Sequence, residues 1–212
     1  MDITVLTSSE EHPVYAYLQK WIQSNAAQHN IELCLKVDEV NQGDFLFLIS
    51  CGEVVPAAVR EKYKYCLVVH ASDLPKGRGW SPHIWQILEG KDEIVVSLLE
   101  VEDKVDTGAI WKKEIMKLEG HELYDEINTK LFQITLNLMD YAIKNCDDSA
   151  PQKQSESEAS YYSKRTPDDS RIDISLPLQE QFDLLRVADT QRFPAFFEHR
   201  GHRYTIKIEK DD

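Results

Sequence analysis

The stretch YCLVVHASDLPKGRG, residues 65–79, joins a run of apolar residues to a polar loop that contains proline and glycine. A nearly continuous apolar run such as 65–70 is typical of a strand that is covered on both faces. Such strands belong to parallel sheets flanked by helices, so this stretch predicts an α/β fold. His70 then stands at the carboxyl end of a buried strand, the edge at which open α/β sheets bind ligands.

The segments on either side of this stretch repeat the pattern. Apolar residues at helical spacing predict a helix from Pro13, a short helix from Pro56, and helices over 80–88 and 121–145. Between them, further strands are predicted at 3–7, 31–37, 45–50, 94–100 and 109–115. We therefore expect a Rossmann-like, mainly parallel sheet with flanking helices.

The composition changes after the long helix. Residues 147–160 are polar and Ser-rich, which predicts a flexible connection between a core over 1–146 and an extension over 161–212. The extension should contain a loop, a helix near 178–188 and a short C-terminal β-hairpin. The hairpin is predicted by two short apolar runs around Gly201, at 195–198 and 204–208.

Length and charge narrow the classes of partner. The chain has 212 residues, 42% of them hydrophobic, and a formal net charge of −13, so nucleic acid is disfavoured as a partner. We expect no membrane association, because the start lacks a secretory signal and the apolar runs fall short of the ~20 residues that cross a bilayer. The four cysteines lack the spacing of metal ligands, which predicts reduced thiols in a cytoplasmic protein without a metal.

Two loops carry residues suited to chemistry. His70 can hold or release a proton near neutral pH, although a histidine at a strand end also serves purely structural roles. The segment VEDKVDTG, residues 101–108, follows the next predicted long strand. Read alone, its Asp106-Thr107-Gly108 is typical of a turn.

Together, the two loops resemble the N10-formyltetrahydrofolate-dependent formyltransferases. That family carries a His-x-Ser-x-Leu-Pro-x-x-Arg-Gly loop, and here the matching residues are His70, Ser72, Leu74, Pro75, Arg78 and Gly79. It also carries Asp-x-Gly about one helix and one strand later, which Asp106 and Gly108 match. Residues 161–173 and 186–197 look like the sugar N-formyltransferases within this family.

The resemblance implies that the core over 1–146 is a catalytic unit. It would move a formyl group from N10-formyltetrahydrofolate to the amino group of a nucleotide-activated amino sugar. The sugar would be a UDP- or dTDP-linked 4-amino-4,6-dideoxy sugar used in surface glycan synthesis. Other branches match less well, because the loop over 7–11 lacks the glycines of a phosphate site. For a transferase that acts on tRNA, we expect the chain to be too short and too acidic.

The resemblance also assigns roles to residues. His70 and Asp106 would be catalytic. The formyl donor would be held, largely through backbone groups, by Glu53, Val54, Val55, Arg78, Glu102, Asp103, Lys104, Val105 and Asp106. The nucleotide sugar would contact Ser72, Lys76, Tyr161, Tyr162 and Arg165. Two alternatives stay open: Arg78 staples its own loop, and the tyrosines simply pack in an exposed loop.

One residue departs from the family pattern. Val68 stands where the family has an asparagine that donates a hydrogen bond to the developing oxyanion, and loss of such a donor typically costs ~10²–10³ in rate. Either a backbone N–H or Ser72 replaces it, or the enzyme is slow, or the protein only binds folate or a nucleotide sugar. Another small or peptide-linked amine is an alternative acceptor. The apolar hairpin residues make a homodimer our expectation.

Overall fold

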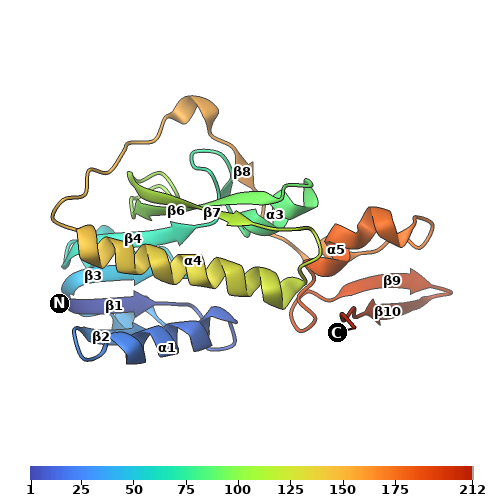
Figure 1. Ribbon diagram of the computed structural model, residues 1–212, viewed down its shortest axis with the longest axis horizontal. Coiled ribbons are helices and arrows are strands. Elements are labelled where there is room, and N and C mark those ends of the chain that lie inside the picture. Colours follow the sequence, from blue (N-terminus) through green and yellow to red (C-terminus); the bar gives the residue numbers. More distant parts are fainter. Residues whose placement is uncertain (212) are drawn as a thin grey trace.

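The computed structural model of the chain describes residues 1–211. Its centre is a six-stranded sheet in the order β2-β1-β3-β4-β6-β7 (Figure 1). The strands are β1 (Asp2–Leu6), β2 (Asn30–Cys34), β3 (Gly43–Leu48), β4 (Tyr63–His70), β6 (Glu93–Glu100) and β7 (Ile110–Lys117). The first four pair in parallel, whereas β4–β6 and β6–β7 are antiparallel. The expected mainly parallel α/β sheet is therefore confirmed, with β6 and β7 forming an antiparallel edge.

Alternating side chains of the central strands divide the core into two layers. Phe45 and Phe47 of β3 point to one face, where α1 (Val14–Asn25), α3 (Pro82–Leu88) and α4 (Tyr124–Asn145) cover them. Leu46 and Leu48 point to the other face, toward Val55 and α2 (Ala57–Arg60). Burial on both faces explains why these strands read as continuous apolar runs.

Several helix boundaries differ from those expected. The helix predicted over 80–88 begins only at Pro82, because Ser81 has a φ of +45°, in the left-handed region. The helix near 178–188 is a 3₁₀ turn, Leu178–Gln181, followed by α5 (Phe182–Arg186). Further 3₁₀ turns lie at Val37–Glu39, Glu156–Glu158 and Pro167–Ser170. Among residues 1–211, none of the helices has the length and hydropathy that a bilayer crossing requires.

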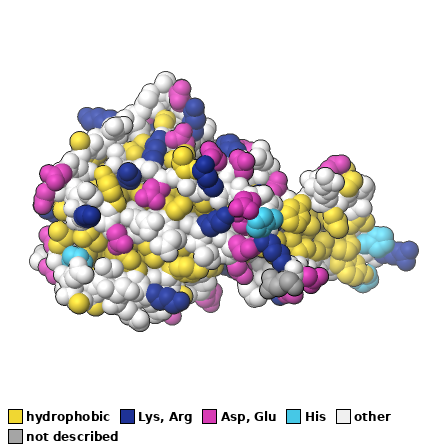
Figure 2. Space-filling view, viewed as in Figure 1, with side chains coloured by type: hydrophobic (Ala, Val, Ile, Leu, Met, Phe, Trp, Pro, Cys, Tyr) yellow, Lys and Arg dark blue, Asp and Glu magenta, His cyan; other side chains and the backbone are white. Residues whose placement is uncertain are grey.

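The predicted C-terminal hairpin is present. It consists of β9 (Ala195–His199) and β10 (His202–Ile206), which pair in antiparallel register across Gly201. Apolar side chains gather over this extension (Figure 2). The large exposed ones in this part are Ile174, Leu176, Leu178, Phe182 and Tyr204. The homodimer stays a prediction.

The segment over 147–160 passes above the sheet on its way to the extension (Figure 1). The backbone N–H and carbonyl of Gln152 both pair with Ile110 at the start of β7, at 2.8 Å each. The segment then leads into β8 (Tyr161–Tyr162), which pairs in parallel with β5 (Arg78–Gly79). We call residues 152–162 the strap. The boundaries 1–146, 147–160 and 161–212 stay predictions.

Candidate active site

His70 and Asp106 lie side by side at the edge of the sheet. β4 ends at His70, whose side chain is 8% exposed. Its Nδ1 is 3.4 Å from Asp106 Oδ1, and its Nε2 is 2.9 Å from the carbonyl oxygen of Gly77. Both neighbours are oxygen acceptors, so an imidazole with a proton on each nitrogen can donate toward both. The two residues predicted to be catalytic are thus brought together with the geometry of an acid–base pair.

Asp106 is held in an unusual backbone conformation. Its φ is +59°, in the left-handed region that non-glycine residues enter at a cost of about 1–3 kcal/mol. Its Oδ2 accepts a hydrogen bond from the backbone N–H of Gly79 at 2.9 Å. This contact joins the loop after β6 to the loop after β4.

Gly108 is required by a close approach of two backbone segments. A Cβ atom at this position would lie 1.9 Å from the carbonyl oxygen of Glu100. Only glycine fits there without a shift of the backbone. Both specified residues of the Asp-x-Gly motif therefore have a structural reason. Asp106 binds the backbone N–H of Gly79, and Gly108 permits the close approach to Glu100.

Arg78 is completely buried, at 0% exposure. Its NH1 donates to Glu156 Oε2 at 3.2 Å and to the hydroxyl of Tyr161 at 3.1 Å. Its NH2 donates to Gln154 Oε1 at 2.8 Å and to Glu156 Oε1 at 3.1 Å. Burial alone opposes the charge, but the hydrogen bonds to Glu156 and Tyr161 raise the pKa of Arg78 overall. The guanidinium therefore anchors the strap, whereas the alternative considered from the sequence was that Arg78 staples its own loop.

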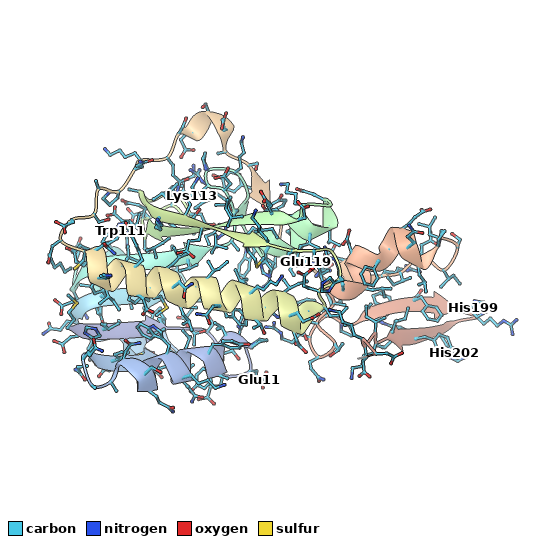
Figure 3. The ribbon with its side chains drawn as sticks, in the orientation of Figure 1. Glu11, Trp111, Lys113, Glu119, His199 and His202 are labelled. Atoms are coloured by element: carbon cyan, nitrogen blue, oxygen red, sulfur yellow. The ribbon has the colours of Figure 1, made fainter. Side chains whose placement is uncertain are left out.

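A third element supports the loop after β4. Lys113, which Figure 3 shows on β7, donates to Asp73 Oδ1 at 2.6 Å and to the carbonyl of Leu74 at 2.8 Å. The loop is thus held by the sheet, by Asp106 and by the strap. His199 and His202 lie at the far end of the hairpin, away from this site (Figure 3).

Comparison with known proteins identifies the family. The profile described as formyl transferase matches residues 4–141. The chain belongs to the formyl transferase family. Methionyl-tRNA formyltransferase from Rickettsia prowazekii is 32% identical over 163 residues, 76% of this chain and 52% of that protein. The chain spans about half the length of the curated relatives it matches.

Solved structures share the formyl transferase fold. A methionyl-tRNA formyltransferase from Clostridium thermocellum has a TM-score of 0.84 at 24% identity, covering 100% of this chain and 94% of that one. A sugar N-formyltransferase from a Shewanella species has 0.74 at 14%, covering 100% and 98%. HypX from Aquifex aeolicus in complex with tetrahydrofolic acid has 0.78 at 18%, covering 97% and 37%. At these identities the likeness shows the fold alone.

The residues predicted to contact the formyl donor form no single cluster of side chains. Val55 is buried in the core, whereas Glu53, Val54, Glu102 and Val105 are exposed. Arg78 and Asp106 are described above, and the last two are engaged by protein partners: Asp103 pairs with Arg60, and Lys104 Nζ lies 3.4 Å from Glu156 Oε2. Glu102 and Asp103 also line a hollow of about 400 Å³ beside α2 and β4, which His70 and Asp106 do not line.

The residues predicted to contact the acceptor lie near the catalytic pair or on the strap and just beyond it. The Ser72 side chain is 1% exposed, and its hydroxyl has no hydrogen-bond partner among the described residues. The Tyr162 ring stacks on Trp85 with centroids 6.3 Å apart, and its hydroxyl donates to Glu89 at 2.8 Å. The others are exposed or partly exposed: Tyr161, Lys76 with its Nζ 3.4 Å from Glu158, and Arg165 over the Trp85 ring.

Val68 supplies no hydrogen-bond donor from its side chain. It is half-buried on β4 and packs against the apolar cluster beneath the sheet that contains Leu46 and Leu48. Within residues 1–211, the buried Ser72 hydroxyl is a donor without a protein partner. The replacement of the family asparagine stays a prediction.

Sequence reasoning missed Gln154, Glu156, Ser160 and His83. Ser160 Oγ accepts from the backbone N–H of Gly77 at 2.9 Å. Burial, and then the positive charges that His70, His12 and Arg165 can carry, lower the pKa of His83 to about 4. His83 is therefore a neutral imidazole near pH 7. Gln, Glu and Ser in a polar run are typical of a linker, so no local pattern singles out these strap residues.

Proposed function

We propose that this protein is an N-formyltransferase that moves a formyl group from N10-formyltetrahydrofolate to the amino group of a nucleotide-activated amino sugar. The observation that carries the proposal is the His70–Asp106 pair, at the carboxyl end of a buried strand in a member of the formyl transferase family. Such an acid–base pair is what transfer to an amine requires, because the amine must lose a proton in the reaction.

The loops beside the pair are compatible with a folate donor. Val54 and Val105, on the loops after β3 and β6, are 70% and 59% exposed and offer apolar contact to a planar ring. The donor would supply the activated formyl group. Arg78 is not available to bind the donor in this arrangement, because protein partners enclose its guanidinium.

His70 and Asp106 then divide the proton transfers. Asp106 Oδ1 faces His70 Nδ1, and this carboxylate can accept a proton from the attacking amine directly or through water. When its Nε2 leaves the Gly77 carbonyl, which it contacts at 2.9 Å, His70 can donate a proton to the leaving nitrogen and stabilise the negative charge that develops on the formyl oxygen. The backbone N–H of Gly79 keeps the Asp106 carboxylate oriented for this role.

Aromatic and cationic groups favour a nucleotide sugar as the acceptor. Trp80 is 46% exposed and has Lys164 Nζ 4.8 Å from its ring centre. Tyr161 is 58% exposed, next to the Tyr162–Trp85 stack. Aromatic faces bind bases, and nearby cations bind phosphates. The net charge of −13 is compatible with such a small acceptor.

A second candidate is transfer to an aminoacyl-tRNA. Relatives at 32% identity carry the name methionyl-tRNA formyltransferase, which favours it. The overall charge opposes it, because tRNA binding requires a basic surface. On the face in Figure 2, lysine and arginine are interspersed with aspartate and glutamate.

One assay separates the candidates. Purified protein is mixed with N10-formyltetrahydrofolate and, separately, with UDP- and dTDP-linked 4-amino-4,6-dideoxy sugars, other small amines and methionyl-tRNA. Mass spectrometry then detects the addition of one formyl group. We expect formylation of a sugar nucleotide. Formylation of tRNA alone, or of another amine alone, would replace the proposed acceptor. No product with any amine, together with measurable tetrahydrofolate binding, would make the protein a binding protein.

We also propose a cytoplasmic location for this protein. Its four free cysteines support this, because reduced thiols are typical of cytoplasmic proteins.

A further inference from the structure

Gln154 of the strap connects Arg78 to the loop that carries Asp106. Its side-chain Nε2 donates to the carbonyl oxygen of Asp106 at 2.9 Å and to that of Gly108 at 2.8 Å. Its Oε1 accepts from Arg78 NH2 at 2.8 Å. Both N–H groups and the oxygen of the amide are therefore used.

Arg78 determines which way the Gln154 amide points. A guanidinium has donors and no acceptor, so the oxygen of Gln154 must face Arg78 and the nitrogen must face the two carbonyls. Arg78 itself is held by both carboxylate oxygens of Glu156 and by the hydroxyl of Tyr161. The buried arginine thus presents Gln154 in one orientation.

The carbonyls that Gln154 binds belong to Asp106 itself and to Gly108, two residues later. The left-handed φ of Asp106 is unfavourable for a residue with a side chain, so surrounding contacts must maintain it. This backbone conformation aims the carboxylate at Gly79 N and His70 Nδ1, at 2.9 and 3.4 Å. A hydrogen bond to the Asp106 carbonyl fixes the backbone from which the carboxylate projects.

We propose that Gln154 is a positioning residue that holds Asp106 in the conformation needed for formyl transfer. This inference rests on the proposed function. The role is local, because other contacts keep the strap in place without Gln154. These are the Gln152–Ile110 backbone pair, the β5–β8 pair and the bond from Gly77 N to Ser160.

The decisive variant is Gln154→Glu. It keeps an oxygen acceptor for Arg78 but has no N–H to donate to the carbonyls of Asp106 and Gly108. Gln154→Leu is the second variant, because it removes the donors without adding a charge. Gln152→Glu is the matched control, since its side chain is exposed on the same strap.

We expect both Gln154 variants to lower kcat by about ten- to hundred-fold, with the KM values for donor and acceptor changed less than about three-fold. The thermal midpoint should stay within about 3 °C of the control, a change of roughly 1 kcal/mol or less. Wild-type kcat in Gln154→Glu would overturn the proposal, because Gln154 would then only anchor Arg78. A kcat loss that appears in Gln154→Glu but not in Gln154→Leu would also overturn it, since the added charge would be the cause.

Crystal structures of the wild-type protein and Gln154→Leu give a readout that does not depend on the acceptor. We expect Asp106 to leave the left-handed region or its carboxylate to move away from His70. An unchanged Asp106 would overturn the proposal even if activity fell. If the wild-type protein formylates no acceptor, the proposed function fails, and this structural comparison still decides the role of Gln154 in holding Asp106.

Discussion

The loops that follow β4 and β6 meet at the candidate active site but are built in opposite ways. The loop after β4 exposes Asp73 and Lys76 but buries three side chains, with Ser72 and Leu74 at 1% exposure and Arg78 at 0%. The loop after β6 exposes Glu102 to Val105 and is tied down by Asp106 and Gly108. Side-chain packing therefore shapes the first loop, whereas a few backbone constraints shape the second.

Substitutions in the two loops should therefore have different effects. In the loop after β6, Asp103 and Lys104 make only surface ion pairs, so we expect the positions of Asp106 and Gly108 to depend on the close backbone approach to Glu100 and on Gln154. The loop after β4 is instead held by hydrogen bonds from the sheet, from the strap and from Arg78. The following substitutions test that contrast.

The largest effect is expected for Asp106→Asn. Asparagine tolerates a left-handed backbone and can still accept from Gly79 N–H, so the loop should keep its shape. The carboxylate charge is lost, and we expect the rate of formyl transfer to fall by ~10²–10⁴ with little change in the thermal midpoint. Steady-state kinetics measure the rate. Asp147→Asn, at a side chain 81% exposed, is the control and should be active at the wild-type level.

Gly108→Ala should produce the largest loss of stability in the loop after β6. The new Cβ would lie 1.9 Å from the Glu100 carbonyl oxygen, so one of the backbone segments must move. We expect about 3 kcal/mol of destabilisation. Calorimetry should show a thermal midpoint lower by roughly 6–12 °C. Gly52→Ala is the matched control, because a Cβ there has no neighbour closer than 3.7 Å. Equal stability of the two variants would mean that the close approach is unimportant.

Arg78→Lys should have an intermediate effect. A lysine keeps one positive charge but cannot reach Glu156, Tyr161 and Gln154 with the two-pronged geometry of a guanidinium. We expect a loss of about 1–3 kcal/mol in unfolding free energy by chemical denaturation, because buried partners lose hydrogen bonds. Activity should fall about ten-fold through Gln154. A fully stable and active variant would show that the strap does not need its buried anchor.

The smallest effect is expected for Thr107→Val. The Thr107 hydroxyl donates to the Lys104 carbonyl at 2.7 Å, which is an ordinary turn hydrogen bond. Valine has a similar shape, so the cost should be about 1 kcal/mol or less, measured by urea denaturation. A loss of unfolding free energy as large as that of Gly108→Ala would contradict this account, because the turn hydrogen bond would then hold the loop after β6.

The sequence predicted those features of the fold and of the site that depend on local periodicity or on the spacing of motifs. Continuous apolar runs located β3, β4 and β6, because burial on both faces leaves that pattern. The pairing of His70 with Asp106 followed from two family motifs in the right order. The strap could not be predicted, because Gln154 and Glu156 have a structural role only through their hydrogen bonds with Arg78, which is distant in the chain. For the same reason the sequence left the role of Arg78 undecided.

We propose that His70, paired with Asp106, carries out proton transfer during formylation of a small amine. The single-turnover rate of formyl transfer with enzyme in excess, in the wild-type protein and in His70→Gln, measures this role. Glutamine can still donate to the Gly77 carbonyl but cannot act as an acid or base. We predict a rate lower by ~10²–10⁴ with unchanged tetrahydrofolate affinity. A wild-type single-turnover rate in His70→Gln would contradict the claim.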